Sequence, residues 1–324
     1  MRRGKEKYQC QGCKKWFHIN RTSPRVSPRI LTLQHLAGTP FRSLGLQYGV
    51  GSTTAYRRVQ ETLTTLPLCI DVTRTYCTQF SGILLVDGKY VSVKGYDRKI
   101  PVLYGVDYMT HDIPHVLFSI AENYHTCSSF FRSLAFANYP LQAVVCDDNQ
   151  NIYQSAKWVD PHTAIQLCHV HYLRSVRILL DPEHRHDDAR FFGDLCTLFV
   201  VKRSIGDFQG RARALYEQYQ TLPQYRDILL DLEKKQVLLL GYHAHRNTPT
   251  TTNLIESLNS HLQGRLDTIK GFESFQHAET WLNGYFLKRR TTPFTDCTRK
   301  FHRLNGKTSL SQTQKTGIDV PTFF

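Results

Sequence analysis

Short apolar runs bounded by polar turns divide the middle of the chain into alternating strands and helices. Two buried strands are predicted at 83–86 and 143–146, because each is an aliphatic run that ends in an acidic residue and a loop signal. The other expected elements are strands at 82–87, 90–93, 102–107, 115–121, 141–146 and 164–167, and helices at 127–138 and 150–159. Antiparallel strands followed by alternating helices and strands predict an α/β fold, with a mixed sheet flanked by helices.

After the last of these strands the pattern becomes helical. Helices are expected at 173–180, 189–201, 205–220 and 225–240, and no strand is expected among them. A further helix is predicted at 253–263, with Thr251 or Thr252 as its N-cap. The stretch 69–77 reads as a connector, and the polar, basic residues after 291 as a loosely ordered tail.

Three short helices are predicted before the strands, within residues 27–63. Pro28 favours a helix start, Gly38 and Pro40 end the first helix, and Ser52 suits the N-cap of the third. A helix, a glycine-containing turn and a helix rich in Arg and Thr indicate a helix-turn-helix, whose second helix would enter a major groove. Such a unit can also be a plain packing module. The candidate DNA contacts are Arg42, Tyr56, Arg57 and Arg58.

Charge favours DNA binding for this segment. The chain has 324 residues and a net charge of +14; residues 1–60 hold twelve Lys or Arg and one acid (12 − 1 = +11), which leaves +3 for the rest. Basic charge concentrated at one end suits contact with phosphates, which supplies affinity independent of base sequence. There is no apolar run of membrane-spanning length and no apolar signal-peptide stretch, so we expect a cytoplasmic protein with no membrane partner.

The N-terminal segment also contains half of a zinc ribbon. The chain has nine cysteines, most of which we expect to be buried thiols, but Cys10 and Cys13 form a C-x-x-C pair. Two thiolates at this spacing can hold two corners of a tetrahedral Zn²⁺. A closed site needs further ligands, which His18 or a distant residue would have to supply.

Three acidic residues carry the candidate chemistry. Asp87 and Asp147 each end a predicted strand, and Glu256 lies in a predicted helix. Carboxylates from these positions can converge on a pair of hard divalent cations, which stabilise the attacking and leaving oxygens of a phosphodiester. The expected chemistry is metal-dependent cutting and joining of nucleic acid. No glycine-rich phosphate loop is present, so no nucleotide cofactor is expected.

The motifs VDGKYV, VVCDDN, QLCHVH and TTNLIESLN, in this order across 81–290, resemble those of the DDE transposases of bacterial insertion sequences, which are related to the Mutator-like elements. The resemblance implies a ribonuclease H-like fold with an all-helical insertion. It also implies that Asp87, Asp147 and Glu256 are a catalytic triad that uses Mg²⁺ or Mn²⁺ for strand cleavage and strand transfer. The partners would be transposon-end DNA and target DNA, and the enzyme would be nucleoid-associated and act as a homodimer or larger oligomer.

The resemblance includes one further motif, and the chain departs from the family's pattern in two places, one of which is the missing first zinc knuckle before Cys10. The family carries a C-x-x-H motif after the second acid, matched by Cys168 and His171, which either bind metal, position DNA or lock the insertion onto the core. The family usually has glycine after the second Asp, whereas this chain has Asp148. Adjacent strand residues point to opposite faces, so only one of Asp147 and Asp148 can face the metals, and the motif register favours Asp147.

The expected organisation has five parts. These are a partial zinc ribbon (1–20), a helix-turn-helix (21–66), a ribonuclease H-like catalytic domain (80–168 and 243–290), a helical insertion (169–242) and a basic tail (291–324). Rival functions are a metal-dependent nuclease of the same fold and a non-catalytic DNA-binding regulator.

Three further features have two interpretations each. Asp107 is a supporting carboxylate or a turn former. Trp281 stacks on an unpaired base or is a core aromatic. The basic run 288–290 follows the DNA backbone or is a solvated helix end.

Overall fold

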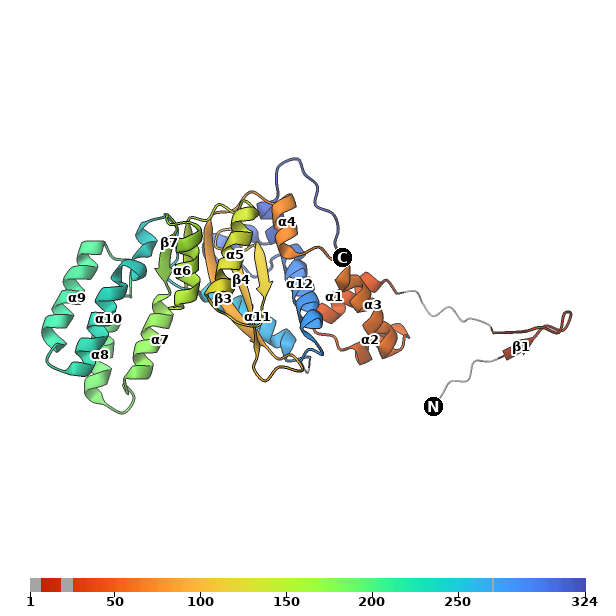
Figure 1. Cartoon of the computed structure of the whole chain (residues 1–324), viewed down its shortest axis with the longest axis horizontal. Helices are drawn as coiled ribbons and strands as arrows, with labels where there is room; N and C mark the ends of the chain where they lie inside the picture. Colours follow the sequence, from red (N-terminus) through yellow and green to blue (C-terminus); the bar gives the residue numbers. More distant parts are fainter. Residues whose placement is uncertain (1–6, 19–25, 270) are drawn as a thin grey trace. The chain divides into compact units, whose positions relative to one another are not determined.

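The computed structural model describes residues 7–18, 26–269 and 271–324. It forms two compact units, Met1–Thr65 with Phe324, and Leu66–Phe323. The first unit contains an antiparallel hairpin of β1 (Lys7–Gln9) and β2 (Trp16–His18) and three helices (Figure 1).

The three helices are α1 (Pro28–Leu36), α2 (Phe41–Tyr48) and α3 (Ser52–Thr64). As predicted, α1 begins at Pro28, but the N-cap of α3 is Gly51 rather than Ser52. The turn between α2 and α3 is tight, because a Cβ on Gly45 would lie 2.7 Å from the carbonyl oxygen of Val50. Buried aliphatic side chains from all three helices make the core of this part: Leu31, Leu36, Leu44, Ala55, Val59 and Leu63.

The second unit is built on the predicted mixed sheet. Its strands are β3 (Ile83–Val91), β4 (Ile100–Asp107), β5 (His115–Phe118), β6 (Ala143–Cys146) and β7 (Ala164–Leu167). The spatial order is β5-β4-β3-β6-β7, antiparallel through β5, β4 and β3 and parallel through β3, β6 and β7.

The two strands expected at 82–87 and 90–93 are one continuous strand. Gly88 lies in the gap between the two predicted strands, but it stays in register opposite Leu103. A glycine is required at this position for packing, because a Cβ on Gly88 would overlap the carboxylate of Glu122.

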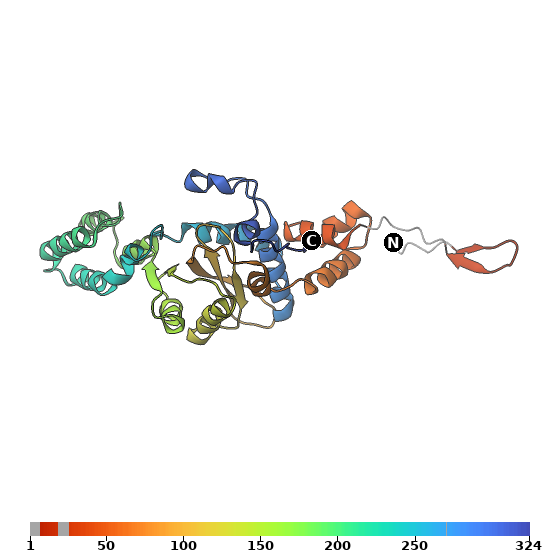
Figure 2. The same ribbon diagram turned by 90° about the horizontal axis from the view of Figure 1, so that it is seen from above.

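Helices cover both faces of the sheet. In Figure 2, α5 (Tyr124–Phe136) and α6 (Gln150–Val159) lie on one face, and α11 (Asn253–Leu266) lies on the other. Leu84, Val86, Val144 and Cys146 belong to the core cluster that includes the aromatic side chains of α5. Because side chains alternate along a strand, the residues between them face α11.

The stretch 69–77, predicted to be a connector, contains helix α4 (Cys69–Tyr76). Its buried residues Cys69, Val72 and Thr73 have helical spacing. The hydrophobic pattern did not predict this helix, because Val72 is the only aliphatic residue among the three.

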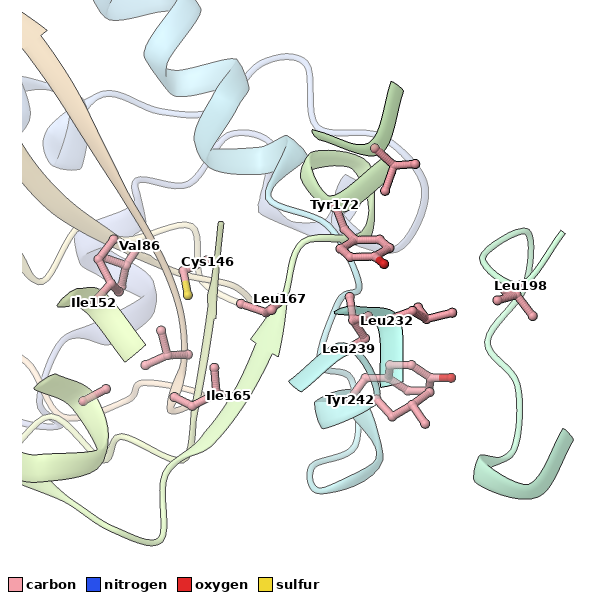
Figure 3. Close-up of a cluster of buried hydrophobic side chains, with 14 of the residues drawn as sticks. Val86, Cys146, Ile152, Ile165, Leu167, Tyr172, Leu198, Leu232, Leu239 and Tyr242 are labelled. Atoms are coloured by element: carbon pink, nitrogen blue, oxygen red, sulfur yellow. The ribbon is translucent and has the colours of Figure 1, made fainter. Parts of the chain in front are cut away.

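The helical insertion follows β7. It comprises α7 (His169–Leu179), α8 (His186–Cys196), α9 (Ile205–Tyr219), α10 (Pro223–Leu239) and the short helix η1 (Gly241–His243). Figure 3 shows that Leu167 of β7, Tyr172 of α7 and Leu239 of α10 belong to one buried cluster. The insertion is therefore packed onto the sheet edge, and the Gln166 side chain secures it by donating to Leu239 O (3.0 Å) and accepting from Tyr242 N (2.7 Å).

The prediction of a loose tail after 291 is wrong. Helix α12 (Phe275–Thr291) is followed by η2 (Arg299–Leu304) and α13 (Ser309–Thr313). The hydroxyls of Ser309 and Thr313 each donate to the buried Asp112 carboxylate at 2.8 Å. A polar segment can thus pack by hydrogen bonding, which a hydrophobic pattern does not reveal.

Candidate active site

Asp147 directly follows β6, as predicted, whereas Asp87 lies inside β3 and not at the end of a strand. β3 and β6 run parallel, with Leu85 opposite Val145. Asp87 and Asp147 are each two positions further along, so their side chains point to the same face of the sheet. Burial raises the pKa of Asp87 to about 6, and the negative charge of Asp147 contributes to the rise. The two carboxylates are therefore close enough to repel each other.

The burial of Asp87, together with its repulsion by Asp147, leads to a pH-dependent prediction for Asp87→Asn. Folding raises the pKa of Asp87 from its ordinary 3.8 to about 6, so the stability that this proton confers is complete below pH 3.8 and is lost as the pH rises through about 6. Removing the charge should raise the free energy of unfolding at pH 8 by about 1 kcal/mol, a figure reduced for the hydrogen bonds that the carboxylate loses. Urea unfolding in EDTA at pH 8 and pH 5 measures it.

The gain should shrink at pH 5, where wild-type Asp87 is mostly protonated. Asp148→Asn is the matched control, because Asp148 already has a cationic partner, and it should give no gain at pH 8. A variant Asp87→Asn that is less stable than wild type at pH 8 and equally so at pH 5 would contradict the prediction.

Asp148 points away from this pair. Its carboxylate lies 2.6 Å from Lys235 Nζ, which also lies 2.8 Å from Asp231 on the same helix, α10. For Asp147, burial raises the pKa, and nearby His171 opposes the rise. Asp147 thus faces the candidate site, whereas Asp148 binds the insertion.

Glu256 lies in the first turn of α11, whose N-cap is Thr252 as expected. The Thr252 hydroxyl donates to Glu256 Oε1 at 2.7 Å and also lies 3.2 Å from Cys168 Sγ and 3.3 Å from His171 Nδ1. His171 Nε2 is 3.9 Å from Glu256 Oε1. His171 therefore lies directly beside the third acid, and Cys168 is linked to it through the Thr252 hydroxyl.

Cys168 and His171 also act on each other. Burial of the Cys168 thiol opposes ionisation, but hydrogen bonds from His171 and Thr252 outweigh it and lower the pKa. The pKa of His171 is raised, first by its hydrogen bond to Cys168. His171 also lies near Asp147, so it stands between the second and third acids.

The three carboxylates are not gathered into one cluster as they stand. Among the described residues, one group of three potential metal ligands has its donor atoms within 4.8 Å of one another, and it consists of Cys168, His171 and Glu256. Asp87 and Asp147 lie outside that group. The structure thus brings the aspartates together and links Glu256 to Asp147 through His171.

Asn259 makes the second link between α11 and the aspartates, which the sequence analysis missed. Its side-chain amide donates to Asp87 Oδ2 at 2.6 Å, and the buried Tyr104 hydroxyl donates to Asn259 Oδ1 at 2.9 Å. Tyr104 thereby fixes which end of the amide faces Asp87. Asn259 follows Glu256 by three residues and shares its helix face, a spacing that could have identified it.

Glu122 is a fourth acid that sequence reasoning missed. It accepts hydrogen bonds from Tyr90 (2.8 Å) and Asn149 (2.5 Å), side chains that follow Asp87 and Asp147 in the chain. Burial raises its pKa, although both hydrogen bonds oppose the rise. Glu122 lies in the loop between β5 and α5, where no periodic pattern marks it.

Two lesser candidates are structural. Asp107 accepts hydrogen bonds from Ser81, Thr110 and Tyr139, which fits the turn-forming interpretation. Trp281 is 1% exposed and stacks on Tyr285, which fits the core interpretation. Arg290 of the basic run is fully buried against Asp112, so for this residue neither the DNA contact nor the solvated helix end is correct, whereas Lys288 and Arg289 are half-buried.

The zinc half-ribbon is a hairpin with two thiols. Cys10 N donates to Lys15 O at 3.0 Å, and Lys14 N donates to Cys10 O at 2.9 Å. Hydrogen bonds from Cys13 and Gly12 lower the pKa of Cys10, which favours the thiolate that Zn²⁺ requires. In the described part of the chain, no third ligand atom joins the two sulfurs, and the side chain of His18 lies outside that part.

The candidate DNA contacts lie on the outer side of the three-helix part. Arg42, Tyr56 and Arg57 are exposed, whereas Ala55 and Val59 of α3 are buried. Arg58 is half-buried, and Arg57 lies 3.7 Å from Glu61. The face of α3 opposite its packing face thus carries polar and cationic side chains.

Comparisons with known proteins identify the family. The model of the family described as "Transposase, Mutator family" matches residues 73–283, and a search of the curated proteins gives no match. None of the described helices is long and apolar enough to cross a membrane.

Two solved structures are distantly similar. One is the strand transfer complex of the Drosophila P element transposase (TM-score 0.48, 11% identity, 82% of this chain and 92% of that chain). The other is an intasome of simian T-cell lymphotropic virus in complex with the PP2A regulatory subunit B56 gamma (TM-score 0.24, 13% identity, 69% and 77%). The family match extends over 211 of the 324 residues (283 − 73 + 1), and the chain therefore belongs to the Mutator family of transposases.

Proposed function

We propose that this transposase is a DDE enzyme that binds the ends of its mobile element and catalyses metal-dependent strand cleavage and strand transfer. The observation that carries the proposal is the placement of Asp87, inside β3, beside Asp147, which directly follows the parallel strand β6, with the Glu256 helix attached to Asp87 through Asn259. A mixed sheet that is antiparallel on one side of β3 and parallel on the other supports the ribonuclease H-like fold that the resemblance implies.

The acids suit a hard divalent cation. The pKa values of Asp87, Asp147 and Glu122 are all raised, first by burial, so the site holds carboxylates that its own cations do not neutralise. Mg²⁺ prefers such oxygen ligands. Asp87, Asp147 and Glu256 would hold Mg²⁺ or Mn²⁺, which when bound activates the attacking oxygen and stabilises the leaving one.

The chain's own residues orient these ligands. Asn259 and the backbone N–H of Gly88 each hold one oxygen of Asp87, at 2.6 and 2.8 Å, which fixes the carboxylate plane. Thr252 holds Glu256 Oε1 toward Cys168 and His171. Release of that bond would free the Glu256 carboxylate to turn toward the two aspartates.

DNA recognition is assigned to the first unit. The outward face of α3, with Tyr56, Arg57 and Arg58, would enter the major groove, and Arg42 would contact a phosphate. Cys10 and Cys13, which precede these helices in the sequence, would contribute two ligands to a Zn²⁺ site. Joining two element ends requires at least a homodimer.

The test is a cleavage assay with purified full chain, Mg²⁺ and the native flanking DNA. Wild type should cut at the element end, and Glu256→Gln should lower the rate roughly 10³-fold, because a metal ligand contributes several kcal/mol to transition-state stabilisation. DNA affinity should be unchanged. Glu273→Gln is the control, because Glu273 is an exposed acid paired with Lys94.

Other outcomes favour the rivals. Equal cutting of unrelated DNA would indicate a general nuclease, and binding of the element end without cutting would indicate a regulator. Equal rates for wild type and Glu256→Gln would remove Glu256 from the site.

A further inference from the structure

The C-terminal loop, residues 293–308, is folded rather than free. Its two ends are joined by hydrogen bonds from Phe294 N to Lys307 O (2.9 Å) and from Gly306 N to Phe294 O (2.8 Å). Inside the loop, the Asn305 side chain accepts from Cys297 N and donates to Cys297 O. The loop therefore presents its side chains from a defined backbone.

The C-terminal loop is strongly basic. It contains four Lys or Arg and one acid, Asp296, for a net charge of 4 − 1 = +3. Its exposed cations are Arg299, Lys300, Arg303 and Lys307. Within the described residues, none of the four has a carboxylate within 4.0 Å, unlike most of the exposed arginines of the insertion. The positive charge of the loop is thus not neutralised by ion pairs.

Aromatic rings hold the cations in place. Phe301 of the loop packs on His111 (ring centroids 4.3 Å apart) and Tyr108 (5.3 Å). Lys300 Nζ lies 4.5 Å from the centroid of Tyr108, and Arg289 of α12 lies 4.8 Å from that of Phe294. The positions of these cations are therefore set before any partner binds.

The cations of the loop converge with others from distant parts of the chain. Burial lowers the pKa of His111 to about 4, and the charges of Arg289, Lys300 and Arg303 contribute. Lys300 also acts on Lys202 of the insertion. Lys202 Nζ donates to Thr248 O at 2.6 Å, four residues before the N-cap of α11. The positive charge thus extends from the loop to the segment that leads into the Glu256 helix.

We propose that the C-terminal loop, together with Arg289 and Lys202, is a second DNA-binding surface that contacts the phosphate backbone of the duplex near the candidate active site. Cations from three separate segments repel one another, and a polyanion with closely spaced charges relieves that repulsion at several of them together. The surface offers cationic donors and no groove-entering helix, so the contact is independent of base sequence. The inference rests on the proposed function only in that DNA is the substrate.

The test compares two double variants of the full chain that lose the same charge. Lys300→Gln with Arg303→Gln removes cations of the surface. Lys94→Gln with Arg213→Gln removes two exposed cations of the same unit that are paired with Glu273 and Glu217. Binding to a fluorescent duplex of unrelated sequence is measured by anisotropy in EDTA over a range of KCl concentrations.

The surface variant should bind on the order of tenfold more weakly near 0.1 M salt, and the slope of log K against log salt should fall by about 2, or about 0.9 for each lost phosphate contact. The control variant should keep the wild-type slope. Equal slopes and affinities for the two variants would overturn the proposal.

Two measurements keep the result unambiguous. Thermal unfolding of both variants checks that the fold is intact, and Arg299→Gln with Lys307→Gln provides a second surface pair should the first be unstable. The binding assay contains no divalent metal, so it stands whether or not the acids catalyse cleavage. Loss of cleavage in Glu256→Gln with normal binding tests the proposed function separately.

Discussion

Replacement of Asp147 by Ala is expected to lower the rate of Mg²⁺-dependent DNA cleavage roughly 10³-fold, whereas replacement of Asp148 by Ala leaves it within about threefold of wild type. The two residues are adjacent in sequence but have different partners. Asp147 faces Asp87 and His171, whereas Asp148 binds Lys235 of α10 at 2.6 Å.

The pair of variants decides the register of the motif. Removal of Asp148 breaks a partly exposed ion pair, which should cost at most about 1 kcal/mol of stability and no DNA affinity. Cleavage is measured on the element-end duplex, with unfolding in urea as a control for each variant. A large rate loss in Asp148→Ala and none in Asp147→Ala would reverse the assignment and move the metal ligands to the insertion side of the strand end.

The sequence predicted the parallel half of the sheet because its strands have a simple hydrophobic pattern. The runs that became β6 and β7 are short, aliphatic and followed by loop signals, and the helices between and after them have clear periodicity. The helical insertion was predicted for the same reason. Strand pairing follows from these elements, and with it the closeness of Asp87 and Asp147.

What could not be predicted depends on contacts between distant residues. Asn259 contacts Asp87 across 172 positions, and Thr252 contacts Cys168 across 84. The spacing from Glu256 and the N-cap position single out Asn259 and Thr252 within their helix, but the sequence does not show which distant residue each side chain contacts. The gap predicted between 87 and 90 has a related cause, since a glycine that makes room for Glu122 has the same sequence signal as a glycine that ends a strand.

The C-terminal segment shows a third kind of limit. Its low hydrophobicity predicted disorder, yet it is anchored by hydrogen bonds of Ser309 and Thr313 to a buried carboxylate and by Phe301 packed on His111. This carboxylate belongs to Asp112, which lies in the β4–β5 connection. Its role in holding the segment could not be predicted from the sequence, because its arginine partner is distant in the chain.

That partner leads to the largest expected change in stability. Arg290→Met should lower the free energy of unfolding of the second unit by about 3–5 kcal/mol, because it leaves the Asp112 carboxylate buried without its cation. Both side chains are fully buried, and Arg290 donates to both Asp112 oxygens at 2.8 and 2.9 Å and to Cys69 O at 2.9 Å. Guanidinium unfolding of the full chain measures the shift.

Two further variants separate the ion pair from general damage. Arg177→Met is the matched control, because Arg177 pairs with Glu183 at the surface, and its loss should cost about 1 kcal/mol or less. Adding Asp112→Leu to Arg290→Met should recover part of the lost stability, because it removes the uncompensated charge. The prediction fails if the double variant has a lower free energy of unfolding than Arg290→Met, by as much as Asp112→Leu alone lowers that of wild type. The hydroxyls of Ser309 and Thr313, rather than the arginine, would then be the main partners of Asp112. The C-terminal segment would in that case stabilise the core more than α12 does.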